Sequence, residues 1–202
     1  MKDLIGTDVY LIDQILKGRY LQSQKILDAG CGSGRNMRWF ALNGYAVFGC
    51  DVNPDVIDLA QENTRLSSDR FTVCPVEKMG YADKTFDHII CNAVLHFAKS
   101  EEHFMQMIGE MDRVLKPNGM LFIRMTSTFG LPLNYQLLGN GRYFLADGSE
   151  RFLLTETLLS GLKSLGFEQI EPVKSVLVEE LRSMSTLVLR KREEFAKQTI
   201  LL

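Results

Sequence analysis

The sequence lacks long apolar runs, an excess of basic residues and any CxxC pair. No uninterrupted apolar stretch approaches the roughly 18 residues that a membrane-spanning helix requires, and residues 1–20 contain acids and no hydrophobic signal core. The formal net charge of -2 and the isoelectric point near 6.0 provide no general attraction to nucleic acid or to an anionic membrane. We therefore expect a soluble cytoplasmic protein whose partners include neither nucleic acid nor a membrane.

The sequence does contain an alternation of apolar strand segments and helical segments, in a chain long enough for one domain with a full core. Near-continuous apolar strands separated by helices indicate a parallel sheet that is buried on both faces. Asn53 before Pro54, and Ser100 further on, are typical residues for the start of a helix. The strands are expected at 25–30, 46–51, 71–76, 87–94 and 119–127, and the helices at 35–45, at 53–63 and from Ser100 to a stop at Pro117.

The segments on either side of this alternation have other patterns. Residues 4–20 have the apolar spacing of an amphipathic helix, whereas 128–152 is rich in glycine and aromatic residues and is expected to be a long loop. A helix at 155–165, a strand within 167–178 and a strand at 184–190 should follow, and the two strands could pair as an antiparallel hairpin. The predicted fold class is α/β. It is one domain with a doubly wound, mostly parallel seven-stranded sheet, helices on both faces and a C-terminal antiparallel strand pair.

Three glycines directly follow the first expected strand, in the stretch GCGSG at residues 30–34. In a parallel α/β sheet, ligands bind beyond the carboxyl ends of the strands, and glycines let backbone amides approach a ligand closely. Asp51 closes the second strand, where a carboxylate can accept two hydrogen bonds from a ribose diol. The loop and the acid together predict a pocket for an adenosine-bearing ligand. The alternative is a cluster of turn glycines beside a solvated aspartate.

The spacing of these glycines differs from the dinucleotide pattern GxGxxG, whose third glycine packs a helix near a pyrophosphate. Instead, DAGCGSGRN resembles motif I of the class I S-adenosylmethionine-dependent methyltransferases. The resemblance continues through GCDVNPDVIDLAQEN, VEKMGYADKTFDHIICNAVLHF and MDRVLKPNGMLFIRM, and covers about residues 25–127. GCGSGRN and LNGYAV are also similar to the tellurite-resistance methyltransferases. The resemblance implies a Rossmann-like methyltransferase with S-adenosylmethionine as cofactor, S-adenosylhomocysteine as product and a small-molecule substrate.

The resemblance also implies roles for residues of the pocket. The glycine loop would wrap the methionine moiety, Asp28 would hold its ammonium group through the loop or a water, and Asp51 would bind the ribose. The family often has an acid after the third strand that contacts adenine. This chain has Pro75 there, so the contact falls to the amide of Val76 or to Glu77. The expected cofactor-binding residues are Asp28, Gly30, Cys31, Gly32, Gly34, Asp51, Val52, Asn53, Val76, Glu77, Asn92 and Ala93.

His96 is the candidate general base, since an unperturbed histidine titrates near the pH at which a substrate proton must be taken. The alternative is a structural histidine at the end of a strand. A base could also be unnecessary, because a sulfonium methyl is already activated and alignment alone accelerates such a transfer. Asn53 as a helix cap is likewise the alternative to a cofactor role, whereas bracing of the loop backbone by Asp28 is compatible with its cofactor role. His88 and His103 are expected at the surface.

Substrate recognition is expected outside the shared core. A buried arginine such as Arg124 needs an acidic partner, either in the protein or in the substrate, and the aromatic residues could instead pack as core or lid. The predicted substrate-binding residues are Tyr10, Arg124, Tyr135, Arg142 and Tyr143. The single domain, residues 1–202, would comprise a helical cap at 1–24, the cofactor-binding core at 25–127, a substrate-facing loop at 128–152 and a C-terminal helix and strands at 153–202.

The four cysteines, Cys31, Cys50, Cys74 and Cys91, fall at or just past the ends of the first four expected strands. Their spacing fits neither a compact zinc knuckle nor a small disulfide scaffold. We expect reduced thiols that fill tight space, with no metal. A meeting of Cys50 and Cys74 at neighbouring strand ends, about 4.8 Å apart, is the alternative and would allow a metal or redox site.

The predicted function is transfer of a methyl group from S-adenosylmethionine to a small-molecule nucleophile by direct in-line displacement. The alternative is a protein that binds the cofactor without turnover, as a sensor or an assembly partner. A nicotinamide-dependent oxidoreductase would need the third-glycine spacing that is absent, and a nucleic-acid methyltransferase would be expected to carry a recognition domain or a basic excess. The oligomeric state stays open between monomer and homodimer.

Overall fold

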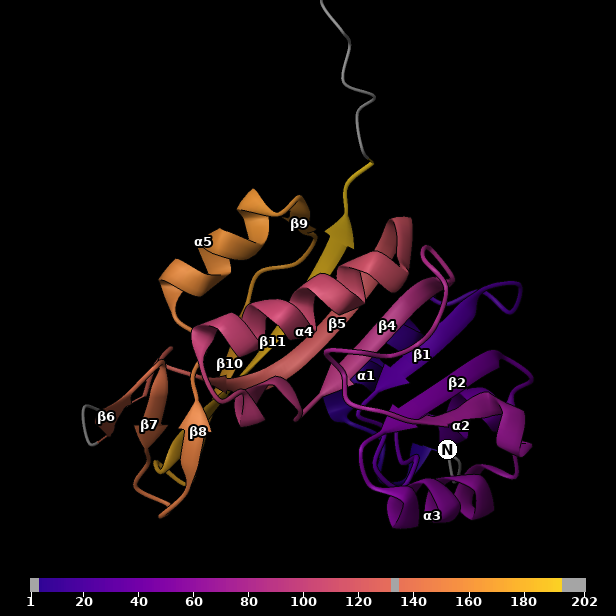
Figure 1. Ribbon diagram of the computed structural model, residues 1–202, viewed down its shortest axis with the longest axis horizontal. Coiled ribbons are helices and arrows are strands. Elements are labelled where there is room, and N and C mark those ends of the chain that lie inside the picture. The colour runs from indigo at the N-terminus through magenta and orange to yellow at the C-terminus, as the bar shows by residue number, and fades with distance from the viewer. Residues whose placement is uncertain (1–3, 132–134, 194–202) are drawn as a thin grey trace, which may run out of the picture.

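The core of the molecule is one mixed β-sheet (Figure 1). The structure is a computed structural model that describes residues 4–131 and 135–193. The strands lie in the order β10-β11-β5-β4-β1-β2-β3, and β9 pairs with β11 beside this row. The pairs among β1 to β5 are parallel, whereas β11 is antiparallel to β5, β9 and β10. These strands are β1 Lys25–Ala29, β2 Ala46–Asp51, β3 Phe71–Val73, β4 Phe86–Asn92, β5 Leu115–Ser127, β9 Phe167–Gln169, β10 Lys174–Val178 and β11 Arg182–Lys191.

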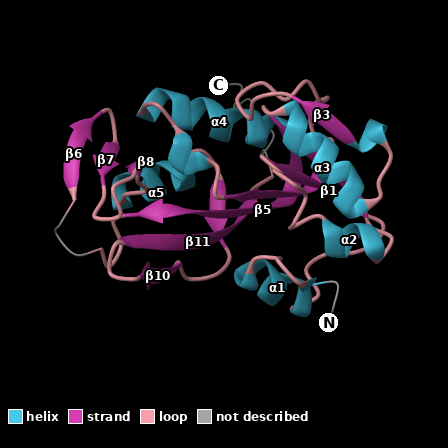
Figure 2. Cartoon of the chain, turned by 90° about the horizontal axis from the view of Figure 1, so that it is seen from below, coloured by secondary structure: helices cyan, strands magenta, loops and turns pink. Residues whose placement is uncertain are grey.

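Helices cover both faces of this sheet, and α4 and α1 lie on opposite sides of β5 and β11 in Figure 2. The sheet has a hydrophobic core on each face, and neighbouring residues of β1 belong to different cores. Ile26 belongs to the core with α1, α2 and α3, and Leu27 belongs to the core with α4 and α5. The predicted doubly wound, mostly parallel fold is therefore confirmed. None of the helices in the described ranges has the length and apolar character to span a membrane. The helices are α1 Val9–Leu16, α2 Arg38–Leu42, α3 Pro54–Thr64, α4 Glu101–Val114 and α5 Glu156–Ser164, with short 3-10 turns η2 Ser68–Arg70 and η3 Leu95–Phe97.

Two helices begin where their capping residues predict. The side-chain oxygen of Asn53 accepts a hydrogen bond from the backbone N–H of Asp55 at 2.9 Å, and Pro54 is the first residue of α3. The hydroxyl of Ser100 accepts one from the backbone N–H of His103 at 3.2 Å, at the start of α4. Each cap satisfies an amide that the helix itself leaves free, so the local sequence determines where these helices begin.

Several elements have other bounds than expected: β3 ends at Val73 rather than at 76, β5 begins at Leu115 rather than at 119, and α1 covers only Val9–Leu16 of the predicted 4–20. The helix predicted at 35–45 starts only at Arg38, because the carbonyl of Gly34 accepts hydrogen bonds from the N–H groups of Met37 and Arg38 in a turn that precedes it. The segment 167–178 holds two short strands, β9 and β10, and Pro172 lies between them. Proline cannot donate to a strand ladder, which accounts for the interruption.

The segment 128–152 is not a loop. It contains β6 Gln136–Gly139, β7 Arg142–Phe144 and β8 Glu150–Phe152, which form a separate antiparallel sheet. This small sheet lies at the opposite end of the molecule from β2 and β3 in both views (Figures 1 and 2). Asn140 and Gly141 join β6 to β7 with φ angles of 53° and 76°, the conformation that an Asn-Gly pair adopts in a tight hairpin. That dipeptide was the local signal for strands here.

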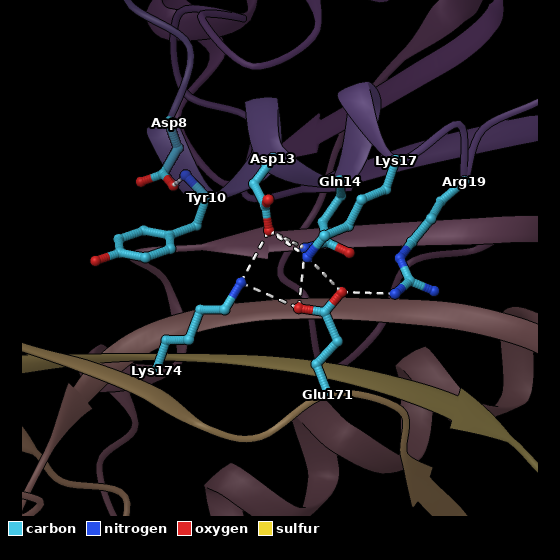
Figure 3. Close-up of polar contacts among 8 residues, drawn as sticks. All are labelled: Asp8, Tyr10, Asp13, Gln14, Lys17, Arg19, Glu171 and Lys174. Atoms are coloured by element: carbon cyan, nitrogen blue, oxygen red, sulfur yellow. Dashed lines mark hydrogen bonds and ion pairs between the residues drawn. The ribbon is translucent and has the colours of Figure 1, made fainter.

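The cap helix α1 is fastened to the C-terminal part of the chain by an ionic cluster (Figure 3). Glu171 lies 2.8 Å from Nζ of Lys17 and 2.6 Å from Nη2 of Arg19, while Asp13 contacts Lys17 at 2.7 Å and Lys174 at 2.9 Å. Burial opposes the ionisation of Glu171, but the hydrogen bonds from these cations outweigh it and lower its pKa to about 2. The cluster therefore holds the cap against the end of the sheet formed by the last strands.

His88, expected at the surface, is buried under the residues that link this cap to β1. Its Nε2 lies 2.7 Å from Oε1 of Gln24, and its ring centroid lies 4.7 Å from that of Tyr20. Burial lowers the pKa of His88 to about 4. A histidine at the start of a central strand is covered here because the chain before β1 folds back over the sheet.

The tight packing at Gly141 gives a stability prediction. A Cβ built there would lie 2.5 Å from Cε2 of Phe152, whereas one at Gly148, with the same φ of 76°, would meet nothing within 4 Å. Both alanine variants carry the cost of a positive φ, about 1–2 kcal/mol, and Gly141→Ala adds overpacking of about 1–3 kcal/mol. Urea denaturation should show Gly141→Ala to be the less stable variant. Equal losses in both variants would contradict the proposed packing role of Gly141.

Candidate functional site

A cavity of about 550 Å³ opens at the carboxyl ends of β1, β2, β3 and β4. This volume falls in the range of cofactor and small-molecule sites, and the position is where a doubly wound sheet binds its ligand. Its walls combine backbone of the glycine loop, Asp51 at the end of β2, and side chains that follow β3, follow β4 or lie on α4. The lining residues are Gly30, Gly32, Asp51, Val52, Cys74, Pro75, Val76, Glu77, Ala93, Val94, Phe97, Lys99, His103 and Met107.

The glycine loop is held by the end of β2. The N–H of Gly30 donates to the carbonyl of Cys50 at 2.8 Å. The N–H of Gly32 donates to Oδ2 of Asp51 at 3.0 Å, and the N–H of Asn53 donates to Oδ1 at 3.1 Å. Asp51 thus positions both the loop and the approach to α3, and each of its oxygens keeps a further lone pair that a ribose hydroxyl could use.

Position 30 requires a glycine because the loop and the segment after β4 approach each other closely there. Its φ is 77°, and a Cβ at this position would lie 2.3 Å from Cγ2 of Val94, which follows β4. Ala93, directly before Val94, has a φ of 62° that is unusual for a residue with a side chain. Backbone of this kind persists where the surrounding structure enforces it, which often occurs at a binding site.

Asp28 lies under the loop and does not line the cavity. It is 1% exposed, and neither carboxylate oxygen has a hydrogen-bond partner in the described part of the chain. Bracing of the loop by hydrogen bonds to this carboxylate is therefore not what the structure shows. Burial raises the pKa of Asp28 to about 7; Arg35 opposes this change and Asp51 adds to it. A buried, unpaired carboxylate is stabilised by a nearby cation, so this position fits a ligand with an ammonium group.

Part of the cavity wall was not predicted from the sequence. Phe97 and Lys99 contribute from the segment between β4 and α4, and His103 and Met107 from α4. His103 was expected at the surface, but its side chain is 17% exposed and Nε2 lies 3.1 Å from Oε1 of Glu77. The spacing of four between His103 and Met107 places them on one helix face. Which face meets the cavity depends on how α4 packs on the sheet, which no local pattern reveals.

The predicted cofactor residues divide into two groups. Seven of them line the cavity: Gly30, Gly32, Asp51, Val52, Val76, Glu77 and Ala93. The other five support it or lie beneath it: Asp28, Cys31, Gly34, Asn53 and Asn92. Gly34 packs against α3, since a Cβ there would lie 3.0 Å from Thr64, and Asn53 is the cap of α3.

His96 lies in η3 and does not line the cavity. It is 7% exposed, its ring centroid lies 4.5 Å from that of Phe97, and Nδ1 has no hydrogen-bond partner in the described ranges. Burial, aided by Arg151 and Arg182, lowers the pKa of His96 to about 4. The ring is therefore neutral near pH 7, the form that can accept a proton. A role as general base stays a prediction.

Arg124, expected to need an acidic partner, has one in the protein. Its Nε lies 3.1 Å from Oδ2 of Asp8, and its guanidinium carbon lies 4.7 Å from the centroid of the Tyr10 ring. Asp8 also receives the N–H of Tyr10 as the cap of α1. Nη1 of Arg124 is buried without a partner in the described chain. A substrate contact by Tyr10 or Arg124 stays a prediction, and the ion pair with Asp8 is the observed environment.

The other predicted substrate residues lie in the small sheet or directly before it. Arg142 pairs with Glu150 at 2.6 Å across β7 and β8, and the two side chains are 40% and 49% exposed. Tyr135 and Tyr143 pack on each other with ring centroids 5.5 Å apart. None of the three lines the cavity. Their contact with an acceptor stays a prediction, and their observed contacts are those of packing and surface pairing.

The four cysteines carry free thiols. Cys50 and Cys74 lie close enough for a thiol hydrogen bond, which raises the pKa of Cys50 and lowers that of Cys74. Cys31 occupies tight space, because its Sγ lies 2.9 Å from where a Cβ on Gly49 would stand. Within residues 4–131 and 135–193, no three histidines, cysteines or acids cluster in a way that could hold a metal ion.

A doubly wound sheet with a glycine loop and a strand-end acid at its ligand crevice defines a Rossmann-like domain that binds a nucleotide-type cofactor. Residues 27–123 match the family model described as a methyltransferase domain. This part of the chain is therefore a methyltransferase domain, as the resemblance of the glycine loop predicted, and its fold is that of S-adenosylmethionine-dependent methyltransferases.

Three similar proteins illustrate the range of the family. An S-adenosylmethionine-dependent methyltransferase from Methanosarcina mazei has a TM-score of 0.75 at 24% identity, covering 89% of this chain and 98% of that one. Thiol S-methyltransferase TMT1B of Rattus norvegicus is 35% identical over 102 residues, which are 48% of this chain and 40% of that protein. The tRNA 5-carboxymethoxyuridine methyltransferase of Escherichia coli (strain K12) is 27% identical over 140 residues, 67% of this chain and 52% of that protein.

The chain spans a limited part of several curated relatives. It covers 23% of a probable tRNA methyltransferase 9B, 40% of the rat thiol S-methyltransferase and 36% of the methyltransferase GfsG from Streptomyces halstedii. The matched stretches are 102 to 110 residues long. The acceptors in these names differ, so the likeness of the core does not identify the acceptor of this chain.

The buried His96 gives a prediction about stability and pH. Its folded-state pKa of about 4 lies below the ordinary value of 6.5, so unfolding takes up a proton in the window between them. The corresponding stability is present above about pH 6.5 and is lost as the pH falls toward 4, by at most about 1.4 kcal/mol per pH unit.

The test compares His96→Gln with the wild type in urea denaturation at about pH 7 and about pH 5. The variant should lose about 1–2 kcal/mol less between these two conditions. His88→Gln, at the second histidine whose pKa is about 4, should show the same difference. Identical pH dependence in the wild type and in both variants would rule out this titration.

Proposed function

We propose that the chain binds S-adenosylmethionine in the cavity beside the glycine loop and transfers its methyl group to a small-molecule nucleophile by direct in-line displacement. The observation that carries the proposal is the joint position of Gly30, Gly32 and Asp51. They border one cavity of about 550 Å³, and the N–H of Gly32 is bonded to Asp51. This arrangement offers backbone to a methionine tail and a carboxylate to a ribose.

Each part of the cavity has a distinct task in this proposal. Asp51 binds the ribose hydroxyls, Val76 flanks the adenine, and Asp28 favours the ammonium group by its charge from beneath the loop. Ala93 and Val94 border the end at which the methyl group is transferred. When bound, the cofactor supplies a methyl group on a positively charged sulfur, which leaves as a neutral thioether. The protein then has to align the nucleophile and exclude water.

A small-molecule acceptor is supported by two observations. The net charge of -2 offers no basic excess for nucleic acid, and a thiol S-methyltransferase is 35% identical over 102 residues. A tRNA acceptor is the second candidate, because a tRNA methyltransferase is similar over 67% of this chain. The similarities do not decide between these two acceptor classes, so a direct test of acceptors is needed.

Ligand-induced stabilisation tests cofactor binding. S-adenosylmethionine and S-adenosylhomocysteine should raise the melting temperature by several degrees near saturation, since a hundredfold excess over Kd contributes about 2.7 kcal/mol. NAD should have no effect. Asp51→Asn should reduce the shift, whereas Asp58→Asn, at an exposed acid of α3 outside the cavity, should leave it unchanged. No shift with either sulfur compound in the wild type would refute the proposal.

Release of S-adenosylhomocysteine then separates an enzyme from a cofactor-binding protein. The acceptor panel should include small thiols and other soft nucleophiles, and bulk tRNA. Turnover with a small molecule supports the proposed acceptor class, and turnover with tRNA alone replaces it by the second candidate. Binding without turnover on any acceptor would favour the sensor or assembly role.

Asp28 gives a prediction for the pH dependence of binding. In the free protein its pKa is about 7, and a bound ammonium group would lower it. Below pH 7 a proton must therefore leave when the ligand binds, so affinity should rise as the pH increases from about 5 to about 7, by up to tenfold per unit. Titration calorimetry with S-adenosylhomocysteine measures this. Asp28→Asn should bind more weakly at neutral pH and show a flatter profile; an unchanged profile would exclude the role.

A further inference from the structure

Arg151 of β8 links the small sheet to the cavity. Its guanidinium carbon lies 5.1 Å from the centroid of the Phe97 ring, within the distance at which an arginine is attracted to the face of an aromatic ring. Phe97 itself lines the cavity and is 60% exposed. The contact therefore places a positive charge one side chain away from the cavity.

Arg151 has no acidic partner within residues 4–131 and 135–193. Its Nη1 donates a hydrogen bond to the carbonyl of Glu150 at 2.8 Å, whereas the carboxylate of Glu150 pairs with Arg142 at 2.6 Å. Burial, aided by Arg151 and Arg182, lowers the pKa of His96, so the charge of Arg151 acts on the segment that contains Phe97. A partly buried cation without a carboxylate partner is stabilised when an anion binds to it.

Lys99 is a second cation without an acidic partner in the described ranges. It lines the cavity, follows Phe97 by two residues and is exposed. The two acids that line the cavity do have partners, since Asp51 accepts two backbone N–H groups and Glu77 lies 3.1 Å from His103. At the cavity wall, the charges left unpaired in the described chain are therefore positive.

Phe97 belongs to the segment that borders the proposed place of methyl transfer. Its N–H donates to the carbonyl of Val94 at 2.9 Å, and Val94 lines the cavity as well. The sulfonium of the methyl donor is itself positive, so unpaired cations near it raise its energy. An anionic acceptor offsets this repulsion, whereas a neutral or cationic acceptor leaves it in place.

We propose that Arg151, held against Phe97, binds a carboxylate of the acceptor, so that the acceptor of this chain is an anionic small molecule. The inference rests on the proposed function and names the chemical class of its acceptor. A guanidinium presents parallel N–H donors that match the two oxygens of a carboxylate. Lys99 adds a second positive charge, and the exposed ring of Phe97 offers an apolar contact to the carbon skeleton of the acceptor.

The test compares two probes, 4-mercaptobenzoate and 4-mercaptobenzamide, which share a ring and a thiol and differ in the charge of one group. Titration calorimetry measures their dissociation constants for the complex with S-adenosylhomocysteine. The wild type should bind the carboxylate about tenfold more tightly, because two cations act on it and one exposed ion pair contributes about two- to fivefold. Arg151→Gln should reduce this preference to about twofold, the part due to Lys99. Arg151→Lys, which keeps the charge but loses the fork of donors, should retain more of it.

Arg190→Gln is the matched control. Arg190 is an exposed arginine of β11 that lies opposite Met120 of β5 and outside the cavity, so the same loss of charge there should leave the preference unaltered. The affinity for S-adenosylhomocysteine alone should be the same in the wild type, Arg151→Gln and Arg190→Gln, which separates a loss of acceptor binding from damage to the cofactor site.

The outcomes distinguish this inference from the proposed function. A wild-type complex that binds both probes equally, or binds neither, overturns this inference alone, as does a wild-type preference retained in Arg151→Gln. A wild type that does not bind S-adenosylhomocysteine overturns the proposed function itself. The wild-type preference stays decisive even if a variant fails to fold.

Discussion

The carboxylate of Asp51 is the interaction on which the site depends. One oxygen accepts the N–H of Gly32 and the other accepts the N–H of Asn53, so a single side chain connects the glycine loop to the entry of α3. Asp51 is also the last residue of β2, beside which β1 and β3 run parallel. The strand pairing thus places the acid, and the acid places the loop. A ligand meets donors and acceptors that are already arranged before it binds.

The parts of the fold that follow from short-range chemistry could be predicted. Asn53 and Pro54 mark the start of α3 because a cap and a fixed φ act within a few residues. Gly30, Gly32 and Asp51 could be assigned to the site because in a parallel sheet the carboxyl ends of neighbouring strands share one edge. In each case the decisive interaction lies within one element or one strand pair, where a sequence pattern carries the information.

The parts that depend on contacts between distant segments could not be predicted. His88 is buried because the chain before β1 folds over it and brings Gln24 and Tyr20 to its ring. His103 enters the cavity wall because α4 packs with that face toward Glu77. Neither position differs in its local pattern from a surface histidine. For the small sheet a local signal, Asn140-Gly141, was present, but the glycines around it suggested a loop.

The extent of the family match explains why the methyl donor is easier to infer than the acceptor. The family match covers residues 27–123 and therefore includes the glycine loop, Asp51 and the α4 wall. The cap helix α1 and the small sheet lie outside it, and so does Glu171, whose ionic cluster joins the cap to the last strands. Arg124 lies just past the match, paired with Asp8 of the segment before α1. The cap and the last strands are thus held together by ion pairs outside the family match, and these parts can vary without a change in the residues that line the cavity.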